Sequence, residues 1–240
     1  MEPKILKPLL HAIVIILAIN SACSRGSETV NKFFSEDSLF VKGIPEQPGE
    51  DSWKFVEDLK SPLWTKHDWI KLKPGETYAD LSEGISLTAG FPDEKNRLNT
   101  AYEDLKSFLA AGGVKSEDGK YIIETVKDAE LTGESFSTSV SKEKCIITAG
   151  DVDGIRRAVF HLEDEMLRLR AANLPLGQSE KHPVILKRIS RCFFGPIKRY
   201  PKMRDELMDD VDYYPGQYLN RLAHEGVNGL WLTVEFRDLV

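Results

Sequence analysis

Three charged residues near the end of the sequence have positions from which they could bind a ligand. Arg191 lies inside the apolar run VILKRISRCFFGPI, and Glu235 and Asp238 follow the apolar run GLWLTV. An arginine guanidinium forms paired hydrogen bonds with neighbouring hydroxyl groups or with a carboxylate. If both runs are strands of one parallel barrel, these side chains gather near the carboxyl ends of the strands, where such barrels bind their ligands. The alternative is that the charges only end the strands and face solvent.

Other motifs with catalytic or cofactor-binding potential are incomplete. HEGVN begins like the zinc-binding HExxH motif, but Asn228 stands where the second histidine is required. AGG and TAGDVDG contain glycines without the spacing of a phosphate-binding loop or a dinucleotide fingerprint. Cys145 and Cys192 lie in apolar runs, which is typical of buried free thiols, although the sequence leaves open whether they pair. We therefore expect no metal and no cofactor.

The composition is that of a globular protein and argues against nucleic-acid binding. The chain has 240 residues, of which 41% are hydrophobic and 29% charged, so it has enough apolar surface for a core. Its net charge of −6 leaves no excess of basic groups to neutralise phosphates. The basic run IKRYPKMR is directly followed by the acidic run DELMDDVD. No nucleic-acid partner is therefore expected.

Residues 1–23 are typical of a signal for export. Lys4 and Lys7 precede the apolar run LLHAIVIILAI, which has the length of a signal-peptide core and is short for a membrane span. NSAC then resembles the lipobox of bacterial lipoproteins, although Asn20 replaces the usual aliphatic residue. This resemblance implies an exported protein, periplasmic or on the cell surface, anchored to a bacterial membrane through a lipid on Cys23. An ordinary secretory signal with a nearby cleavage site is the alternative.

Residues 24–50 are expected to be a flexible tether, because polar residues, glycine and proline dominate them. The segment that follows contains aromatic residues: Trp53, Phe55, Trp64 and Trp69. We expect these to pack against the next domain. An exposed platform for sugars is the alternative function of these aromatic side chains.

Residues 51–176 alternate between helical and extended patterns, which predicts an α+β domain. NTAYEDLKSFLAAGG is typical of an amphipathic helix that starts at an Asn99 N-cap and stops at Gly112–Gly113. YIIETVKD predicts a strand, and ESFSTSVSKEKCIITAG predicts a hairpin. DVDGIRRAVFHLEDEMLRLRAA predicts a long helix capped by Asp151 or Asp153.

Residues 177–183 are expected to form a linker, since proline and glycine mark this part of the chain. After it, VILKRISRCFFGPI predicts a strand buried on both faces, and DDVDYYPGQYLNRLAHEG predicts a helix that ends at Gly226. VNGLWLTVEF predicts a second strand. Residues 184–240 therefore predict a βαβ unit, which buries its strands fully only inside a larger parallel sheet.

The order of these elements resembles the start of the family 20 glycoside hydrolases, the β-N-acetylhexosaminidases, and of related α-glucuronidases. Those proteins have a small α+β domain with strands like ESFSTSVS and KCIITAGD and a glycine-containing helix like GIRRAVFHLEDEML. A linker then leads to a (β/α)₈ barrel whose first strand carries a sugar-contacting arginine near its start. Arg188 or Arg191 lies near that position, with the spacing shifted by one and the following glycine missing. Asn228 matches the second barrel strand, whereas Trp231 and Thr233 replace its two histidines.

The resemblance covers roughly residues 95–240 and implies that residues 184–240 begin an incomplete barrel of a protein that cleaves glycosidic bonds in glycans. It makes Arg191, Glu235 and Asp238 the candidate substrate-binding residues. Family members use an Asp–Glu pair on a later barrel strand, together with the acetamido group of the substrate. That pair lies outside this chain, so we expect no catalytic residue here and no activity of the chain alone. A non-catalytic surface lipoprotein with a carbohydrate-binding or scaffold domain is the alternative.

Overall fold

The computed structural model describes residues 54–72, 77–199, 202–205, 207 and 211–233. The chain divides into two compact units by its internal contacts. The first comprises Trp53–Arg191 and Asp212–Leu232, and the second comprises Met1–Ser52, Cys192–Val211 and Thr233–Val240. The predicted signal and tether lie outside the described residues. None of the described helices is long and apolar enough to cross a membrane.

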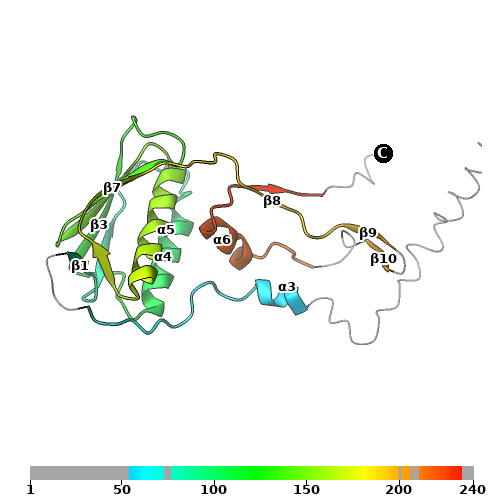
Figure 1. Ribbon diagram of the computed structural model, residues 1–240, viewed down its shortest axis with the longest axis horizontal. Coiled ribbons are helices and arrows are strands. Elements are labelled where there is room, and N and C mark those ends of the chain that lie inside the picture. Colours follow the sequence, from blue (N-terminus) through cyan, green and yellow to red (C-terminus); the bar gives the residue numbers. More distant parts are fainter. Residues whose placement is uncertain (1–53, 73–76, 200–201, 206, 208–210, 234–240) are drawn as a thin grey trace, which may run out of the picture. The chain divides into compact units, whose positions relative to one another are not determined.

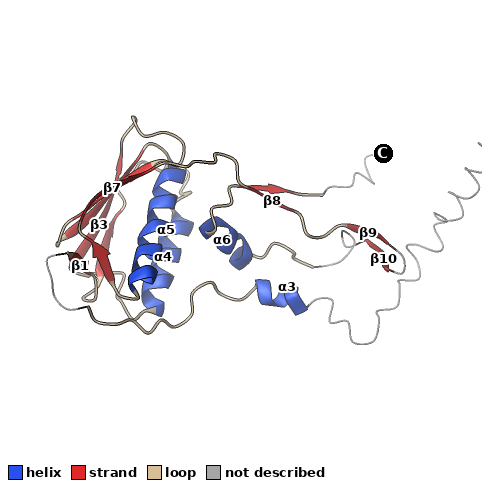
Figure 2. Ribbon diagram, in the orientation of Figure 1, coloured by secondary structure: helices blue, strands red, loops and turns tan. Residues whose placement is uncertain are grey.

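A mixed sheet of five strands forms the centre of the first unit (Figure 2). The strands lie in the order β2-β3-β5-β4-β7. β3 pairs in parallel with β2 and β5, whereas β4 pairs antiparallel with β5 and β7. Their bounds are Ile85–Thr88 for β2, Tyr121–Lys127 for β3, Phe136–Val140 for β4, Lys144–Ala149 for β5 and Gly177–Lys181 for β7. The predicted strand and hairpin are confirmed as β3 and as β4–β5.

Helices α4 (Asn99–Ala111) and α5 (Val152–Leu169) cover one face of this sheet (Figure 1). The apolar stripes expected from the sequence form the core, since Leu105, Phe108 and Ile155 are all 0% exposed. Along β3, buried residues alternate with more exposed ones, as expected when one face of a strand meets the core. The predicted α+β domain is therefore confirmed.

The two helices begin in different ways. Asp151, one of the two predicted caps of α5, accepts a hydrogen bond from the backbone N–H of Gly154 at 2.7 Å. The predicted Asn99 cap of α4 is wrong, because Asn99 is already helical and Leu98 occupies the N-cap position. The N–H of Leu98 donates to the Asp93 carboxylate at 2.7 Å. The acceptor at this helix start therefore comes from a residue further upstream, outside the local capping pattern.

The expected linker at 177–183 is wrong for most of its length, because β7 is the outer strand of the sheet. Directly before it, β6 (Asn173–Pro175) pairs antiparallel with β1 (Tyr78–Asp80). The sequence of β7, GQSEK, lacks the apolar alternation by which strands are usually recognised. Its pairing uses backbone groups, which every residue except proline offers in full. The α+β domain therefore extends past residue 176.

Strands β8 (Ile189–Arg191) and β11 (Gly229–Trp231) pair in parallel, and α6 (Gly216–His224) lies between them in the sequence. The predicted strand–helix–strand order is thereby confirmed. The two strands are shorter than predicted, and they are not buried on both faces here, since Ile189 and Trp231 are 59% and 69% exposed. Within the described residues β8 and β11 form a sheet of two strands, which cannot cover both of its faces. An incomplete barrel remains a prediction.

Several further elements, β1, β2 and β6 among them, were not expected from the sequence. Helix α3 (Lys54–Leu59) precedes the α+β domain, and β9 (Pro196–Arg199) pairs antiparallel with β10 (Lys202–Asp205) in the second unit.

The two cysteines in the described residues are free, with Cys145 buried and Cys192 partly exposed. Burial raises the pKa of the Cys145 thiol to about 12, so this thiol is not a nucleophile near neutral pH.

Trp64 and Trp69 pack against the core, as predicted. Their rings lie 4.8 and 5.7 Å from the ring of Phe108, measured between centroids. Phe55 is 46% exposed, and Trp53 lies outside the described residues. The two tryptophans are partly buried, and their packing holds the segment before β1 against helix α4.

Phe108→Ala tests where the main core lies. The substitution removes a wholly buried ring between α4 and the two tryptophans, and we expect it to lower the free energy of unfolding by about 3–5 kcal/mol in urea denaturation. Ile122→Ala is the control, because Ile122 lies on the other face of β3 and is 40% exposed. Its expected cost is below about 1 kcal/mol. Equal losses would contradict a core confined to the helix-covered face.

Candidate functional site

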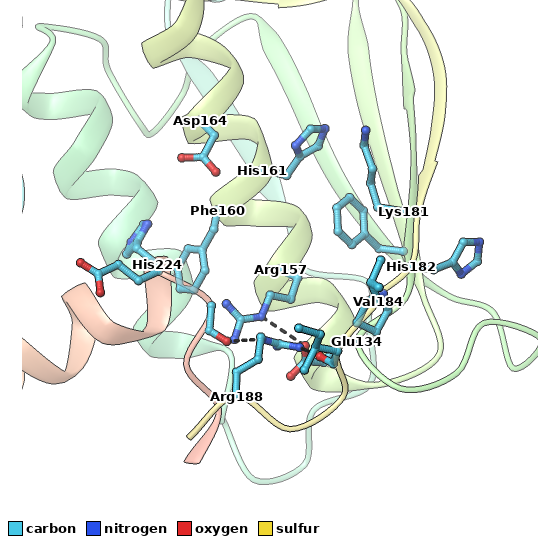
Figure 3. A pocket seen from close by; sticks show the side chains of 15 residues that line it. Glu134, Arg157, Phe160, His161, Asp164, Lys181, His182, Val184, Arg188 and His224 are labelled. Carbon is cyan, nitrogen blue, oxygen red and sulfur yellow. Dashed lines mark hydrogen bonds and ion pairs between the residues drawn. The ribbon is translucent and has the colours of Figure 1, made fainter. Parts of the chain in front are cut away.

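A cavity of about 460 Å³ lies beside α5 in the first unit (Figure 3). Its wall combines the turn before β4, one face of α5, the end of β7 with the segment that follows, and the C-terminal end of α6. The lining residues are Glu134, Phe136, Arg157, Phe160, His161, Asp164, Lys181, His182, Pro183, Val184, Ile185, Arg188, His224, Glu225 and Gly226. The cavity therefore offers hydrogen-bond donors, acceptors and apolar surface to one ligand.

Glu134 reaches the cavity wall from a turn with an uncommon backbone conformation. Its φ of +59° lies in the left-handed region, which residues other than glycine seldom adopt. Gly154, in the first turn of α5, lies close to this turn: a Cβ on Gly154 would be 2.6 Å from the carbonyl oxygen of Ser135. The glycine thus allows the close approach that brings α5 side chains to Glu134. Backbone conformations of this kind are often found at functional sites.

Two arginines from different segments bind the Glu134 carboxylate (Figure 3). Arg157 on α5 places Nε 3.5 Å from Oε2, and Arg188, just before β8, donates from Nη2 to the same oxygen. The side chains of Glu134, Arg157 and Arg188 are 13%, 16% and 24% exposed, so their charges interact in partly desolvated surroundings. Burial acts to raise the pKa of Glu134, but hydrogen bonds from Asn228 and Arg188 and the charges of both arginines outweigh it. The pKa of Glu134 is therefore lowered.

The same arginines bind backbone carbonyls at the end of α6. Arg157 donates from Nη1 to Ala223 O at 2.5 Å and from Nη2 to Val227 O at 3.4 Å. Arg188 donates from Nε to Gly226 O. Ala223 lies in the last turn of α6, and Gly226 and Val227 follow it, a region where backbone oxygens have few partners within the helix. The arginines therefore satisfy them and fix where α6 ends.

Asn228 completes the network with both ends of its amide. Its Nδ2 donates to Glu134 Oε1 at 2.9 Å and to Leu186 O at 2.8 Å, and its Oδ1 accepts from the backbone N–H of Arg188 at 2.9 Å. The residue that resembles the family pattern thus holds the segment before β8 in place. In this structure its amide binds protein groups.

His161 and Asp164 face the cavity from α5 (Figure 3). Burial lowers the pKa of His161, which favours the neutral imidazole near neutral pH. Burial also raises the pKa of Asp164, although the charges of His224 and His161 act in the opposite direction. The ring of His161 lies 5.5 Å from that of Phe136 between centroids. A neutral imidazole can both donate and accept a hydrogen bond, which suits contacts with hydroxyl groups.

The cavity can hold a polar ligand, and Glu134 is not its acid–base group. Cleavage of a glycosidic bond usually needs one carboxyl group that protonates the leaving oxygen and a second that acts on the opposite side of the sugar. Glu134 is engaged by two arginines and an amide, so its carboxylate is not available to move a proton. The remaining donors, among them Lys181 and His182, can hold a polar ligand in the cavity.

A group of potential metal ligands lies next to the cavity, where His224 also faces two carboxylates. Asp104 on α4, Glu163 on α5 and His224 on α6 each offer one ligand atom, and these atoms lie within 4.8 Å of one another. Histidine nitrogen and carboxylate oxygen are both suitable ligands for zinc and related ions.

Of the three predicted substrate-binding residues, the described part of the chain contains Arg191 alone. Arg191 is exposed at the end of β8, opposite Trp231 in the register, and does not line the cavity. Glu235 and Asp238 lie outside the described residues, as does the predicted lipid-bearing Cys23. Arg188, the other arginine of the same apolar run, is the one that enters the network with Glu134.

Glu134 and Arg157 were missed because their partners lie far away in the sequence. Glu134 meets residues 23, 54 and 94 positions further along the chain. The available signals were weak: a glycine before Glu134 and an arginine on the core-facing side of a helix. Neither pattern specifies a site without the fold.

No protein-family model and no curated protein matches this chain. Among solved structures, a GH138 enzyme targeting pectin rhamnogalacturonan II is similar with 19% identity and a TM-score of 0.47, over 63% of this chain and 19% of that one. A GH20 exo-β-N-acetylglucosaminidase from Vibrio harveyi in complex with N-acetylglucosamine gives 18% identity and a TM-score of 0.39, over 72% and 25%. A mutant β-hexosaminidase from Streptomyces plicatus in complex with GlcNAc gives 18% and 0.42, over 72% and 36%.

These structural neighbours are glycoside hydrolases, and this chain spans between 19% and 36% of their length. With TM-scores of 0.39 to 0.47 and identities below one fifth, the likeness does not locate a site in this chain. The site therefore has to be interpreted from its own residues.

Glu134→Gln tests the network by removing the charge shared by the two arginines. We expect a loss of roughly 1.5–3 kcal/mol in the free energy of unfolding at pH 7, since hydrogen bonds to charged groups are worth about that much. Glu57→Gln is the matched control, because Glu57 forms an exposed pair with Lys60 and should change stability by less than about 0.5 kcal/mol. Urea denaturation measures both.

The effect of Glu134→Gln on the free energy of unfolding should depend on pH. Because the folded-state pKa of Glu134 is lowered, its stabilisation is complete above the ordinary glutamate pKa of about 4.3 and is lost as the pH falls through the lowered value. The stabilities of the wild type and of Glu134→Gln should therefore converge as the pH drops below about 4. A difference that stays constant from pH 7 to acid pH would contradict a charged Glu134 in the folded protein.

Proposed function

We propose that this chain is the N-terminal part of an exported glycoside hydrolase acting on glycans. The observation that carries the proposal is the parallel β8–α6–β11 unit that directly follows the α+β domain. A small α+β domain followed by parallel β/α units is the order of parts that the sequence resemblance leads us to expect. Export and a lipid anchor at Cys23 belong to the same proposal and rest on the sequence pattern of residues 1–23.

The exposed apolar side chains of the parallel unit support this proposal. Val184, Ile185 and Leu186 are 97%, 63% and 69% exposed, and Trp231 on β11 is 69% exposed. In a (β/α)₈ barrel the strands are covered inside by layers of side chains and outside by helices. Residues of this kind are therefore expected where further strands and helices of a barrel would pack.

In this proposal the substrate-binding groups are Arg191, Glu235 and Asp238, at or after the carboxyl ends of the two strands. The carboxyl groups that would carry out hydrolysis belong to later barrel strands. The cavity beside α5 then lies in the supporting domain, and its charged network serves to position β8 and β11.

The chain alone is expected to be inactive as a hydrolase. We expect the purified chain to release no p-nitrophenol from p-nitrophenyl N-acetyl-β-glucosaminide above the rate of the heat-denatured chain, because the proposal assigns the two catalytic carboxyl groups to later barrel strands. Absorbance of the released phenol measures this directly. Saturable turnover by the folded chain would contradict the proposal.

A non-catalytic surface lipoprotein would instead bind glycans through tryptophans without turnover. That function would show as binding on a glycan array that is lost when Trp53, Trp64 or Trp69 is changed to Ala. Trp64 and Trp69 pack against Phe108, so the observed packing gives these two rings a structural role.

Hydrogen exchange tests whether the parallel unit lacks its covering elements. We expect the amides of residues 184–191 and 229–231 to exchange much faster than those of α5, because the two strands are short and exposed whereas α5 forms the core. Mass spectrometry of exchanged peptides gives the comparison. Equal protection of both segments would mean that this chain covers the strands by itself, against the proposed barrel start.

A further inference from the structure

Asp104, Glu163 and His224 meet where helices α4, α5 and α6 approach one another. His224 Nε2 lies 2.5 Å from Asp104 Oδ2, and His224 Nδ1 lies 3.5 Å from Glu163 Oε2. The side chains of His224 and Asp104 are 10% and 9% exposed, and that of Glu163 is 0% exposed. Each of the three residues comes from a different helix, so the cluster is a product of the tertiary fold.

Glu163 is the residue that requires an explanation. It is wholly buried, and neither of its carboxylate oxygens has a hydrogen-bond partner among the described residues. An unpaired buried carboxylate is costly, and natural proteins usually pair it, protonate it or use it to coordinate a metal. Burial raises its pKa, and the nearby charges of Asp104 and Asp164 act in the same direction. Among the described residues, the basic group that the structure places beside this carboxylate is His224, whose Nδ1 is 3.5 Å from Oε2 and makes no hydrogen bond to it.

Asp104 is held in a way that leaves one oxygen directed at the cluster. Its Oδ1 accepts hydrogen bonds from Trp64 Nε1 at 3.1 Å and from Asn220 Nδ2 at 2.6 Å. Its Oδ2 is the atom that faces His224. Carboxylates that bind metals are typically hydrogen-bonded in this manner by a second layer of residues, which fixes their orientation.

The imidazole of His224 is held by aromatic rings on two sides. Phe160 lies 3.9 Å from it between ring centroids with planes inclined by 32°, and Trp64 meets it edge-on at 5.0 Å. These contacts restrict rotation of the ring, so the direction of its nitrogens is set before any ligand binds. Such preorganisation lowers the cost of binding.

We propose that Asp104, Glu163 and His224 bind one divalent transition-metal ion, with zinc as the best-suited probe. His224 can bind the ion through one ring nitrogen, and one oxygen each of Asp104 and Glu163 supply two further ligands once the 2.5 Å hydrogen bond between His224 Nε2 and Asp104 Oδ2 opens. These are ligands of the kinds that zinc accepts, and a water molecule can supply a fourth. The ion neutralises the two carboxylates and gives the buried Glu163 its missing partner. By joining α6 to α4 and α5, it stabilises the position of the parallel unit. This proposal does not depend on the glycan function.

The arrangement has a simpler competitor. A protonated His224 can donate one N–H to each carboxylate and needs no metal. The two arrangements predict different effects of added zinc. Zinc should stabilise the folded protein if the cluster is a metal site, and should leave its stability unchanged if the cluster is held together by a protonated His224.

Zinc titration of the full chain separates them. After treatment with a chelator and removal of the chelator, we expect calorimetry with zinc chloride at pH 7.5 to show one zinc per chain. A hundredfold excess of free zinc over the dissociation constant should raise the melting temperature by about 5–10 °C. Absence of stoichiometric binding, or no change in melting temperature, would overturn the proposal in favour of the protonated cluster.

Variants locate the bound ion. Glu163→Gln keeps the shape of the side chain and should weaken zinc binding by at least about tenfold, whereas Glu130→Gln, at an exposed carboxylate, should leave it unchanged. Asn220→Ala keeps all three ligands and removes one hydrogen bond to Asp104, so a loss of about tenfold is expected there too. Circular dichroism shows that each variant is folded. Unchanged zinc affinity in both folded Glu163→Gln and Asn220→Ala would place the ion elsewhere and refute the assignment.

Discussion

The carboxylate of Glu134 is the point on which the arrangement of the first unit depends. It receives Arg157 from α5, Arg188 from the segment before β8 and Asn228 from the segment before β11. Several donors to one partly buried carboxylate outweigh its loss of hydration, and the lowered pKa of Glu134 expresses that balance. Because Arg157 also binds the carbonyl of Ala223, the place of α6 follows from the same interaction. The cavity and the His224 cluster both require α6 in that place.

Glu134, which is partly buried, and Glu163, which is wholly buried, show how partners decide the state of a carboxyl group. Glu134 and Glu163 lie on the same domain and are both largely removed from solvent. The arginines near Glu134 hold it in the charged form, whereas the acidic surroundings of Glu163 favour protonation or a bound cation. Glu134 therefore links structural elements through the positive charges of two arginines. In the metal site that we propose, Glu163 instead binds a cation from solution.

Local patterns predicted the longer elements that bury one face, such as α4, α5 and β3, and missed the short strands β1, β2 and β6 and the polar strand β7. The apolar stripes of α4 and α5 and the alternation of buried and exposed residues along β3 arise because each element packs one face against the core. Their sequences therefore show a recognisable hydrophobic period. β7 has no buried face, so its sequence shows no hydrophobic period, and its strand pairing depends on backbone groups. The site escaped prediction because Glu134, Arg157 and Arg188 become neighbours only through tertiary packing. The substrate-binding role of Arg191 follows from the family resemblance and stays a prediction.

The polar sequence of β7 has a consequence for self-association. As the outer strand of the five-stranded sheet, it presents unpaired backbone groups that could add a strand from another molecule. The charges of Glu180 and Lys181 oppose such pairing, as in natural proteins that guard their sheet edges. Within the described residues β11 pairs only with β8, exposes Leu230 and Trp231, and has no charged side chain between Gly229 and Trp231. At high protein concentration, we therefore expect aggregation to start at the parallel pair β8–β11. We do not expect β7 to add a strand from another molecule.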